Sequence, residues 1–242
     1  MNPLHVIAAG ASKDLVTTLG QRLREATGIA VEGVFGAVGA MQERLLQGAP
    51  CDLIVLTQAQ IDALAAEGRI ERPSIAPLGR VRTGIAVPEG AAPPDISTPA
   101  ALAAAFRAAS AIYVPDTEQS TAGRHFKRVL QILGIADAVA PRIRSFPNGA
   151  SAMRHLAEAG DGHAIGCTQI TEINYTAGLR LIGPLPEELG LATTYTAAVA
   201  AGAAQPDLAR KLVALLAGPD AASLRARAGF EPVSPSSTME SR

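Results

Sequence analysis

The chain has 242 residues, enough for one large domain or for two lobes of about 100 residues each. Its formal net charge is −1 and it has no long basic run, which excludes nucleic acid as the expected partner. Only 3% of the residues are aromatic and none is Trp, so a sugar site or a base-stacking site is not expected. These values agree with a protein that binds a small molecule.

Sequence runs typical of strands alternate with helical patterns in the first third of the chain. Strands are predicted at residues 4–8, 31–35 and 53–56, and helices at residues 13–27, 39–47 and 58–67. Such alternation is typical of parallel α/β architecture. A short apolar strand is then predicted at residues 84–87, before a segment rich in Pro and Gly.

A second α/β series follows this segment. Strands are predicted at residues 112–114, 164–166, 179–182 and 193–201, and helices at 99–109, 122–133, 150–159, 207–216 and 219–228. We expect two lobes joined by crossing strands near residues 79–87 and 192–201, with the ligand in the cleft between them. Lobe 1 is predicted at residues 1–82 and 192–233, an inserted lobe 2 at 83–191, and a flexible tail at 234–242.

Four predicted helices begin directly after turns that contain glycine. The residues of these turns that we expect to contact a ligand are Ser12, Val38, Gly39, Thr121, Ala122, Asn148 and Gly149. A helix start presents free backbone N–H groups and the positive end of the helix dipole, so it can hold an anion. The four starts therefore predict one pocket for a small anion.

Side chains near these turns favour a carboxylate as that anion. Arg80 and Arg82 alternate on one side of a crossing strand, and Arg124 lies in the first turn of the third of these helices. Arginine matches a carboxylate with two parallel hydrogen bonds. Thr168 and Gln169 follow an apolar strand and are expected to line the cleft. The alternative for the three arginines is that they are ordinary solvated surface charges. The alternative for Thr168 and Gln169 is that they cap a loop.

The sequence predicts neither a metal site nor a cofactor. Cys51 and Cys167 lie far apart without metal-ligand spacing, which predicts two small core residues. No nucleophile triad is evident, so no catalytic residue is assigned, and any chemistry would be proton transfer. The titratable candidates for it are His125, Glu118, His155 and His163.

The amino terminus leads directly into the first predicted strand, without the features of a secretion signal. The chain as it stands predicts a cytoplasmic location, or a periplasmic one if a signal was removed. No apolar stretch reaches the roughly 20 residues of a membrane span, so no membrane insertion is expected.

Three segments carry a resemblance to a known family. Residues 48–56 read GAPCDLIVL, residues 217–222 read AGPDAA, and residues 228–230 read AGF. They resemble the molybdate-type solute-binding proteins of ABC importers, and the similarity runs in order through nearly the whole chain. It implies an α/β, two-lobed periplasmic-binding-protein type II fold with two crossing strands. It also implies a small anionic ligand and an ABC permease as partner.

The resemblance assigns the family's oxyanion ligands to individual residues. Ser12 matches the first hydroxyl donor, and Ala122 and Gly149 match backbone donors. Val38 stands at the second serine and Cys167 at the tyrosine, so two side-chain donors are missing. A buried tetrahedral dianion needs nearly all its oxygens hydrogen-bonded, so molybdate is less expected than an organic polycarboxylate.

Four further segments narrow the resemblance. Residues 83–87 read TGIAV, 93–98 PPDIST, 165–173 IGCTQITEI and 183–188 GPLPEE. They resemble a branch that includes aconitate isomerases, which act on a tricarboxylate. Two functions stay open: a solute-binding protein for a small anion, and a cofactor-free isomerase that shifts a C=C bond on the same scaffold. A cytoplasmic ligand sensor is a third reading.

Overall fold

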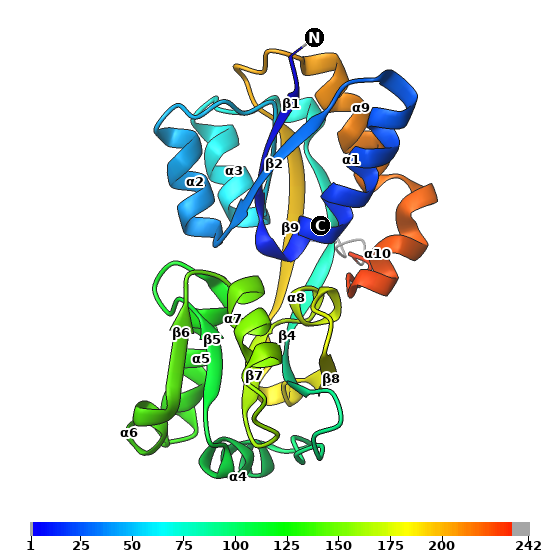
Figure 1. Ribbon diagram of the computed structural model, residues 1–242. Helices are drawn as coiled ribbons and strands as arrows, with labels where there is room; N and C mark the ends of the chain where they lie inside the picture. Colours follow the sequence, from blue (N-terminus) through cyan, green and yellow to red (C-terminus); the bar gives the residue numbers. More distant parts are fainter. Residues whose placement is uncertain (1, 234–242) are drawn as a thin grey trace, which may run out of the picture.

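The protein consists of two α/β lobes, which the computed structural model describes over residues 2–233 (Figure 1). The tail predicted at residues 234–242 lies outside the described residues. The upper lobe contains both ends of the described chain, and the lower lobe contains its middle. The fold predicted from the sequence, two lobes with two crossing strands, is confirmed. The exact lobe boundaries stay a prediction.

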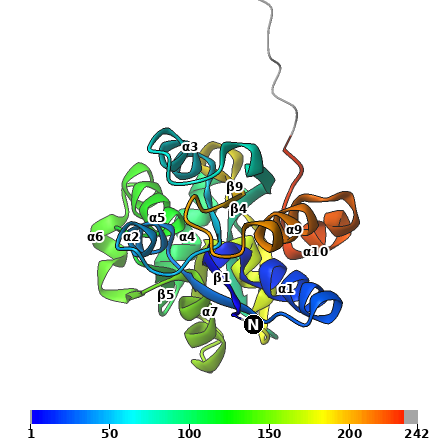
Figure 2. The same ribbon diagram turned by 90° about the horizontal axis from the view of Figure 1, so that it is seen from above.

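The upper lobe begins with three strands, each followed by a helix. Their bounds are β1 (Leu4–Ala9), α1 (Lys13–Thr27), β2 (Val31–Gly36), α2 (Val38–Leu46), β3 (Leu53–Thr57) and α3 (Gln58–Ala66). The strands pair in parallel, with β1 between β2 and β3. Seen from above, α1 and α9 lie on one side of β1, and α2 and α3 lie on the other (Figure 2).

The remaining elements build the lower lobe and return to the upper one. Their bounds are β4 (Ala76–Pro88), α4 (Pro99–Ala108), β5 (Ile112–Pro115), α5 (Thr121–Ile132), α6 (Ala136–Val139), β6 (Ile143–Phe146), α7 (Gly149–Glu158), β7 (Ile165–Gln169), α8 (Ile170–Tyr175), β8 (Leu179–Pro184), β9 (Ala192–Val199), α9 (Pro206–Ala217) and α10 (Ala222–Ala228). The strand order in the described chain is β2-β1-β3-β9-β4-β7-β5-β6, with β8 also paired to β4.

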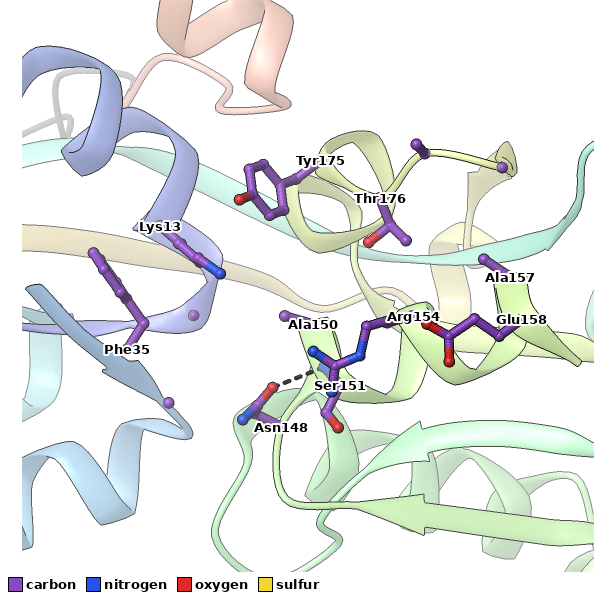
Figure 3. Close-up of a pocket in the computed structure, with 14 residues that line it drawn as sticks. Lys13, Phe35, Asn148, Ala150, Ser151, Arg154, Ala157, Glu158, Tyr175 and Thr176 are labelled. Atoms are coloured by element: carbon purple, nitrogen blue, oxygen red, sulfur yellow. Dashed lines mark hydrogen bonds between the residues drawn. The ribbon is translucent and has the colours of Figure 1, made fainter. Parts of the chain in front are cut away.

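Strand β4 belongs to both lobes and changes partners midway. Up to Arg82 it pairs with β9, and from Thr83 it pairs with β7 and β8. Each lobe has its own apolar core on either side of this point. Phe35 near the end of β2 and Asn148 just before α7 line the same cavity between the lobes (Figure 3).

Most predicted elements are confirmed, and the differences have local causes. Strand β4 begins at Ala76, well before the predicted residue 84. Its first part was not predicted, because Pro77 and Gly79 interrupt the apolar pattern where the pairing with β9 is irregular. Strand β6 was not predicted, since it is short and largely exposed. Helix α8 was not predicted either, since it has only six residues. The last helix begins at Ala222, after a tight turn at Pro219–Ala221.

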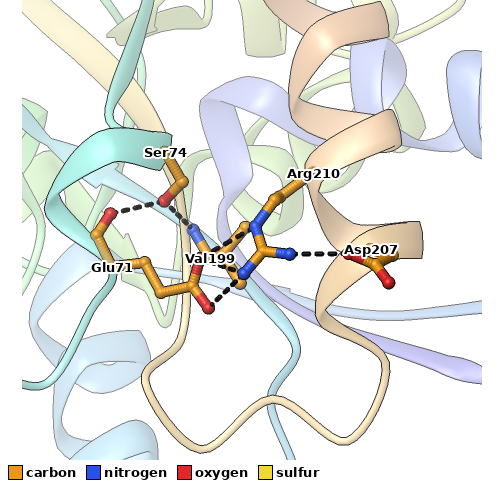
Figure 4. Close-up of polar contacts among 5 residues, drawn as sticks. All are labelled: Glu71, Ser74, Val199, Asp207 and Arg210. Atoms are coloured by element: carbon orange, nitrogen blue, oxygen red, sulfur yellow. Dashed lines mark hydrogen bonds and ion pairs between the residues drawn. The ribbon is translucent and has the colours of Figure 1, made fainter.

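Ser74 links β9 to the segment before β4 through hydrogen bonds (Figure 4). Its hydroxyl donates to the carbonyl of Glu71 at 2.6 Å and accepts the N–H of Val199 at 2.8 Å. Arg210 of α9 holds the Glu71 carboxylate from the other side and also pairs with Asp207. Helix α9, strand β9 and the approach to β4 are thereby joined by one group of polar contacts.

Replacing Ser74 with alanine should lower the free energy of unfolding by about 1–2 kcal/mol, because the N–H of buried Val199 loses its acceptor. Urea denaturation followed by circular dichroism measures the change. Ser223 is exposed, so Ser223→Ala is the control, with an expected change within about 0.5 kcal/mol. Equal stabilities of the two variants would contradict this role of Ser74.

Candidate functional site

A cavity of about 880 Å³ separates the two lobes on the side of α7 and α8 (Figure 3). Its upper wall consists of Gly10 and Lys13, where β1 leads into α1, and of Phe35 and Gly36 at the end of β2. Its lower wall is formed by Asn148, Ala150, Ser151, Arg154, Ala157, Glu158, Tyr175, Thr176, Ala177 and Gly178. Residues far apart in the sequence thus form one site.

Positive charge faces the cavity from both lobes. Lys13 comes from the upper lobe and Arg154 from the lower one, and neither forms an ion pair within the described residues. The Lys13 ammonium lies 5.2 Å from the centre of the Tyr175 ring, so it reaches across to α8. Helices α1 and α7 both begin at the cavity, which adds the positive ends of two dipoles. The arrangement suits an anion.

A buried carboxyl group, Glu172 of α8, lies beside this cavity. Its Oε2 accepts the hydroxyl of Thr168 at 2.6 Å, and the backbone N–H groups of Ala150 and Gln169 lie near enough to favour its ionised form. Burial raises the pKa of Glu172 to about 6, although these donors act in the opposite direction. Its side chain is therefore close to its titration range near neutral pH.

Two glycines make room for the Glu172 carboxylate. A Cβ on Gly10 of the upper lobe would lie 2.6 Å from Oε1, and a Cβ on Gly149 of the lower lobe would overlap Oε2 and the Thr168 hydroxyl. Larger residues at either position would displace the carboxylate. Glu172 therefore sits where the two lobes meet.

Several polar groups are buried near the strand crossing. Burial, and then the Glu172 carboxylate, raise the pKa of Tyr195, so its phenol stays protonated. The Gln169 amide lies near that hydroxyl, yet neither its oxygen nor its nitrogen forms a well-oriented hydrogen bond with a described residue. The hydroxyl of Thr121, at the start of α5, also lacks a described partner. Such groups are costly unless another molecule satisfies them.

Four of the predicted site residues lie at or beside the cavity. Asn148 lines it and caps α7 by accepting the Ser151 N–H at 2.9 Å. Gly149, Thr168 and Gln169 surround Glu172. The structure thus brings the start of α7 and the end of β7 together, as the sequence predicted.

The other helix starts are placed differently. Ser12 is buried, and its hydroxyl donates to the Ala9 carbonyl at 2.8 Å. The N–H of Gly39 donates to the Gln119 carbonyl of the lower lobe at 3.3 Å, so this expected anion donor contacts the chain itself. Val38, Thr121 and Ala122 do not line the cavity. Ala37 and Ala40, on either side of Val38 and Gly39, and Gln119, close before Thr121, border an adjoining cavity of about 510 Å³.

The three predicted arginines do not line the cavity either, which corrects the expectation from the sequence. Arg82 pairs with Glu231 at 2.9 Å, and the backbone of Arg80 is hydrogen-bonded to the same residue. Strand alternation does place them on one side, but there Arg82 is exposed and pairs with Glu231 near the end of the described chain. Arg124 donates to the carbonyl of Glu118 at 2.7 Å, so it fastens its own loop.

None of the four predicted proton-transfer candidates lines the cavity. His125 contacts the Leu189 carbonyl at 2.7 Å, and burial lowers its pKa. The His155 ring stacks on Phe146, and Glu118 pairs with Lys127. The backbone N–H of His163 donates to Asp161.

Sequence reasoning missed Lys13, Arg154 and Glu172. A signal was present for two of them. Lys13 directly follows Ser12, and Glu172 lies within the distinctive segment at residues 165–173, four positions after Thr168. Both cysteines are free, and the described residues contain no cluster of acidic, His or Cys side chains suited to a metal.

Comparisons with known proteins agree with this architecture. The chain is 27% identical over 239 residues to an aconitate isomerase of Pseudomonas sp, covering 95% of this chain and 88% of that protein. The Azotobacter vinelandii periplasmic molybdate-binding protein has a similar fold, with a TM-score of 0.79 and 18% identity over 96% of this chain and 100% of that one. PEB3 bound to L-phospholactate, a protein known from Campylobacter jejuni, matches with a TM-score of 0.66 and 16% identity over 95% of this chain and 100% of that one.

The described part of the chain contains no helix that is long and apolar enough to cross a membrane. The family described as bacterial extracellular solute-binding protein matches residues 4–231, which is nearly the entire described chain. The protein therefore belongs to the bacterial extracellular solute-binding protein family.

Proposed function

We propose that the protein binds a small organic polycarboxylate between its lobes and delivers it to an ABC permease outside the cytoplasmic membrane. The observation that carries this proposal is the pair of cations, Lys13 and Arg154, on opposite walls of one cavity. An anion with carboxylates at both ends can contact both cations at once, which favours closure of the lobes around it.

The size and donors of the site favour a polycarboxylate over molybdate. A cavity of about 880 Å³ is roomy for a tetrahedral oxyanion, which needs donors close to every oxygen. Val38 and Cys167 have no hydroxyl to offer, whereas the Arg154 guanidinium matches a carboxylate in shape. The similarity to an aconitate isomerase supports a carboxylate ligand.

A second candidate function is a cofactor-free isomerase of the aconitate type. The 27% identity to an aconitate isomerase favours it. Such a reaction removes a proton from the carbon next to a carboxylate and returns it at the other end of the allyl system, so it consumes no co-reactant. Glu172, with its pKa near 6, is the buried carboxyl beside the cavity that suits this step.

A thermal-shift screen tests the binding function. The ligands are citrate, cis- and trans-aconitate, tricarballylate, molybdate, tungstate, sulfate and phosphate. We expect the tricarboxylates to raise the melting temperature most, because a ligand at about 100 times its Kd stabilises the fold by about 2.7 kcal/mol. A response to the inorganic oxyanions alone would contradict the proposal.

Chromatography separates the two candidate functions. The purified protein is incubated with trans-aconitate, and the formation of cis-aconitate is followed over time. Binding without conversion is the result expected of a solute-binding protein. Conversion that is lost in the Glu172→Gln variant would instead establish the isomerase.

A further inference from the structure

We propose that Glu172 is a built-in anion that competes with the ligand for the start of α7, so that the protein takes up a proton when an anion binds. This inference rests on the proposed anion-binding function. It adds a positioning residue to the site and makes binding of the anion depend on pH.

The contacts of Glu172 place it beside the ligand's expected position. The backbone N–H of Ala150 lies near enough to favour its ionised form, and Ala150 itself lines the cavity. On the opposite lobe Glu172 lies against Gly10, which lines the same cavity. An anion bound between Gly10 and Ala150 therefore meets the same positive helix end that the Glu172 carboxylate occupies.

No cation neutralises Glu172 within the described residues. It takes part in none of the ion pairs there, and the residue is only 6% exposed. The titratable group that faces it from β9 is Tyr195, which stays neutral, and β7 contributes the hydroxyl of Thr168. The nearest elements carry Lys13 at the start of α1, Arg154 on α7 and Tyr175 at the end of α8, all on the cavity side.

A second negative charge beside Glu172 has one direct consequence. Like charges close together favour the neutral form of one of them, so a bound anion raises the pKa of Glu172 further above its value of about 6. At neutral pH the free protein holds Glu172 mostly ionised and the complex holds it mostly protonated. Binding then takes up close to one proton for each anion.

The sign of the pH dependence follows. Well below pH 6 Glu172 is already protonated, and affinity does not change further through this group. Above that pH the anion must first shift the proton equilibrium, so affinity falls as pH rises, by up to about tenfold per pH unit. The fall ends at the pKa that Glu172 has in the complex.

Titration calorimetry of trans-aconitate into the wild-type protein and Glu172→Gln tests this inference. Titrations run across a range of pH and in two buffers of different ionisation enthalpy. The ligand's own protonation changes with pH in the same way in both series, so its contribution cancels when the two proteins are compared. We expect proton uptake and a falling affinity above about pH 6 for the wild type only, so the variant should bind about tenfold or more tightly at alkaline pH.

A second variant keeps the test decisive if Glu172→Gln fails to fold. Thr168→Val removes the hydroxyl that stabilises the ionised carboxylate, and it should move the wild-type pH profile to higher pH. Identical pH profiles for the wild type and either variant would overturn the role of Glu172 and leave the binding function intact. If the wild type binds no anion of the panel at any pH, the proposed function itself fails.

Discussion

Replacing Gly123 with alanine is expected to lower the free energy of unfolding by about 3 kcal/mol. A Cβ at this position would overlap the backbone carbonyls of Asp116 and Pro115. Backbone atoms cannot rotate away as the end of a flexible side chain can, so α5 must move off the end of β5. That movement loosens Phe126 and Val129, which α5 packs into the core of the lower lobe.

Urea denaturation of the purified variant measures this loss. Gly162 provides the control, because a Cβ there has no neighbour within 4 Å. We expect Gly162→Ala to change the stability by less than about 0.5 kcal/mol. A Gly123→Ala protein as stable as this control would show that α5 tolerates displacement from β5.

Replacing Arg154 with glutamine is expected to weaken tricarboxylate binding by about 10- to 100-fold. A hydrogen bond to a charged group contributes about 1.5–3 kcal/mol, and every 1.4 kcal/mol corresponds to about a factor of ten in Kd. Lys13→Gln should have an effect of the same order, since Lys13 faces the same cavity from the other lobe. Arg154→Lys keeps the charge but loses the guanidinium's two parallel hydrogen bonds to a carboxylate, so an intermediate affinity is expected.

Calorimetry with trans-aconitate measures these affinities. Arg124 is the matched control, because it is exposed on the same lobe and donates to the backbone of its own loop. Arg124→Gln should bind the ligand as the wild type does. Equal losses in the Arg124 and Arg154 variants would mean that long-range charge, and not contact in the cavity, governs the affinity.

The repeating architecture could be predicted from the sequence because its signals are local. Helix α1 was predicted with the residues it has, since its apolar positions recur at helical spacing and Gly28 ends it in a left-handed conformation. The start of α7 was recognised from Asn148 and Gly149 for the same reason. Strand β6 carries no such pattern, since most of its residues are partly or fully exposed.

The charges of the site could not be predicted in this way, since they depend on contacts between distant segments. The alternation of Arg80 and Arg82 shows that they share a side, but not that Glu231 pairs with both of them, through its side chain with Arg82 and through its backbone with Arg80. The role of Glu172 depends on Gly10 and Gly149, which come from different lobes. Only the folded chain brings these residues together.

The most direct test of the central claim is one calorimetric comparison of trans-aconitate and molybdate at the same pH and ionic strength. We predict that one trans-aconitate binds per protein, more tightly than molybdate, and that Arg154→Gln weakens this binding. Tight binding of molybdate, with no heat of binding from trans-aconitate, would contradict a polycarboxylate site between the lobes.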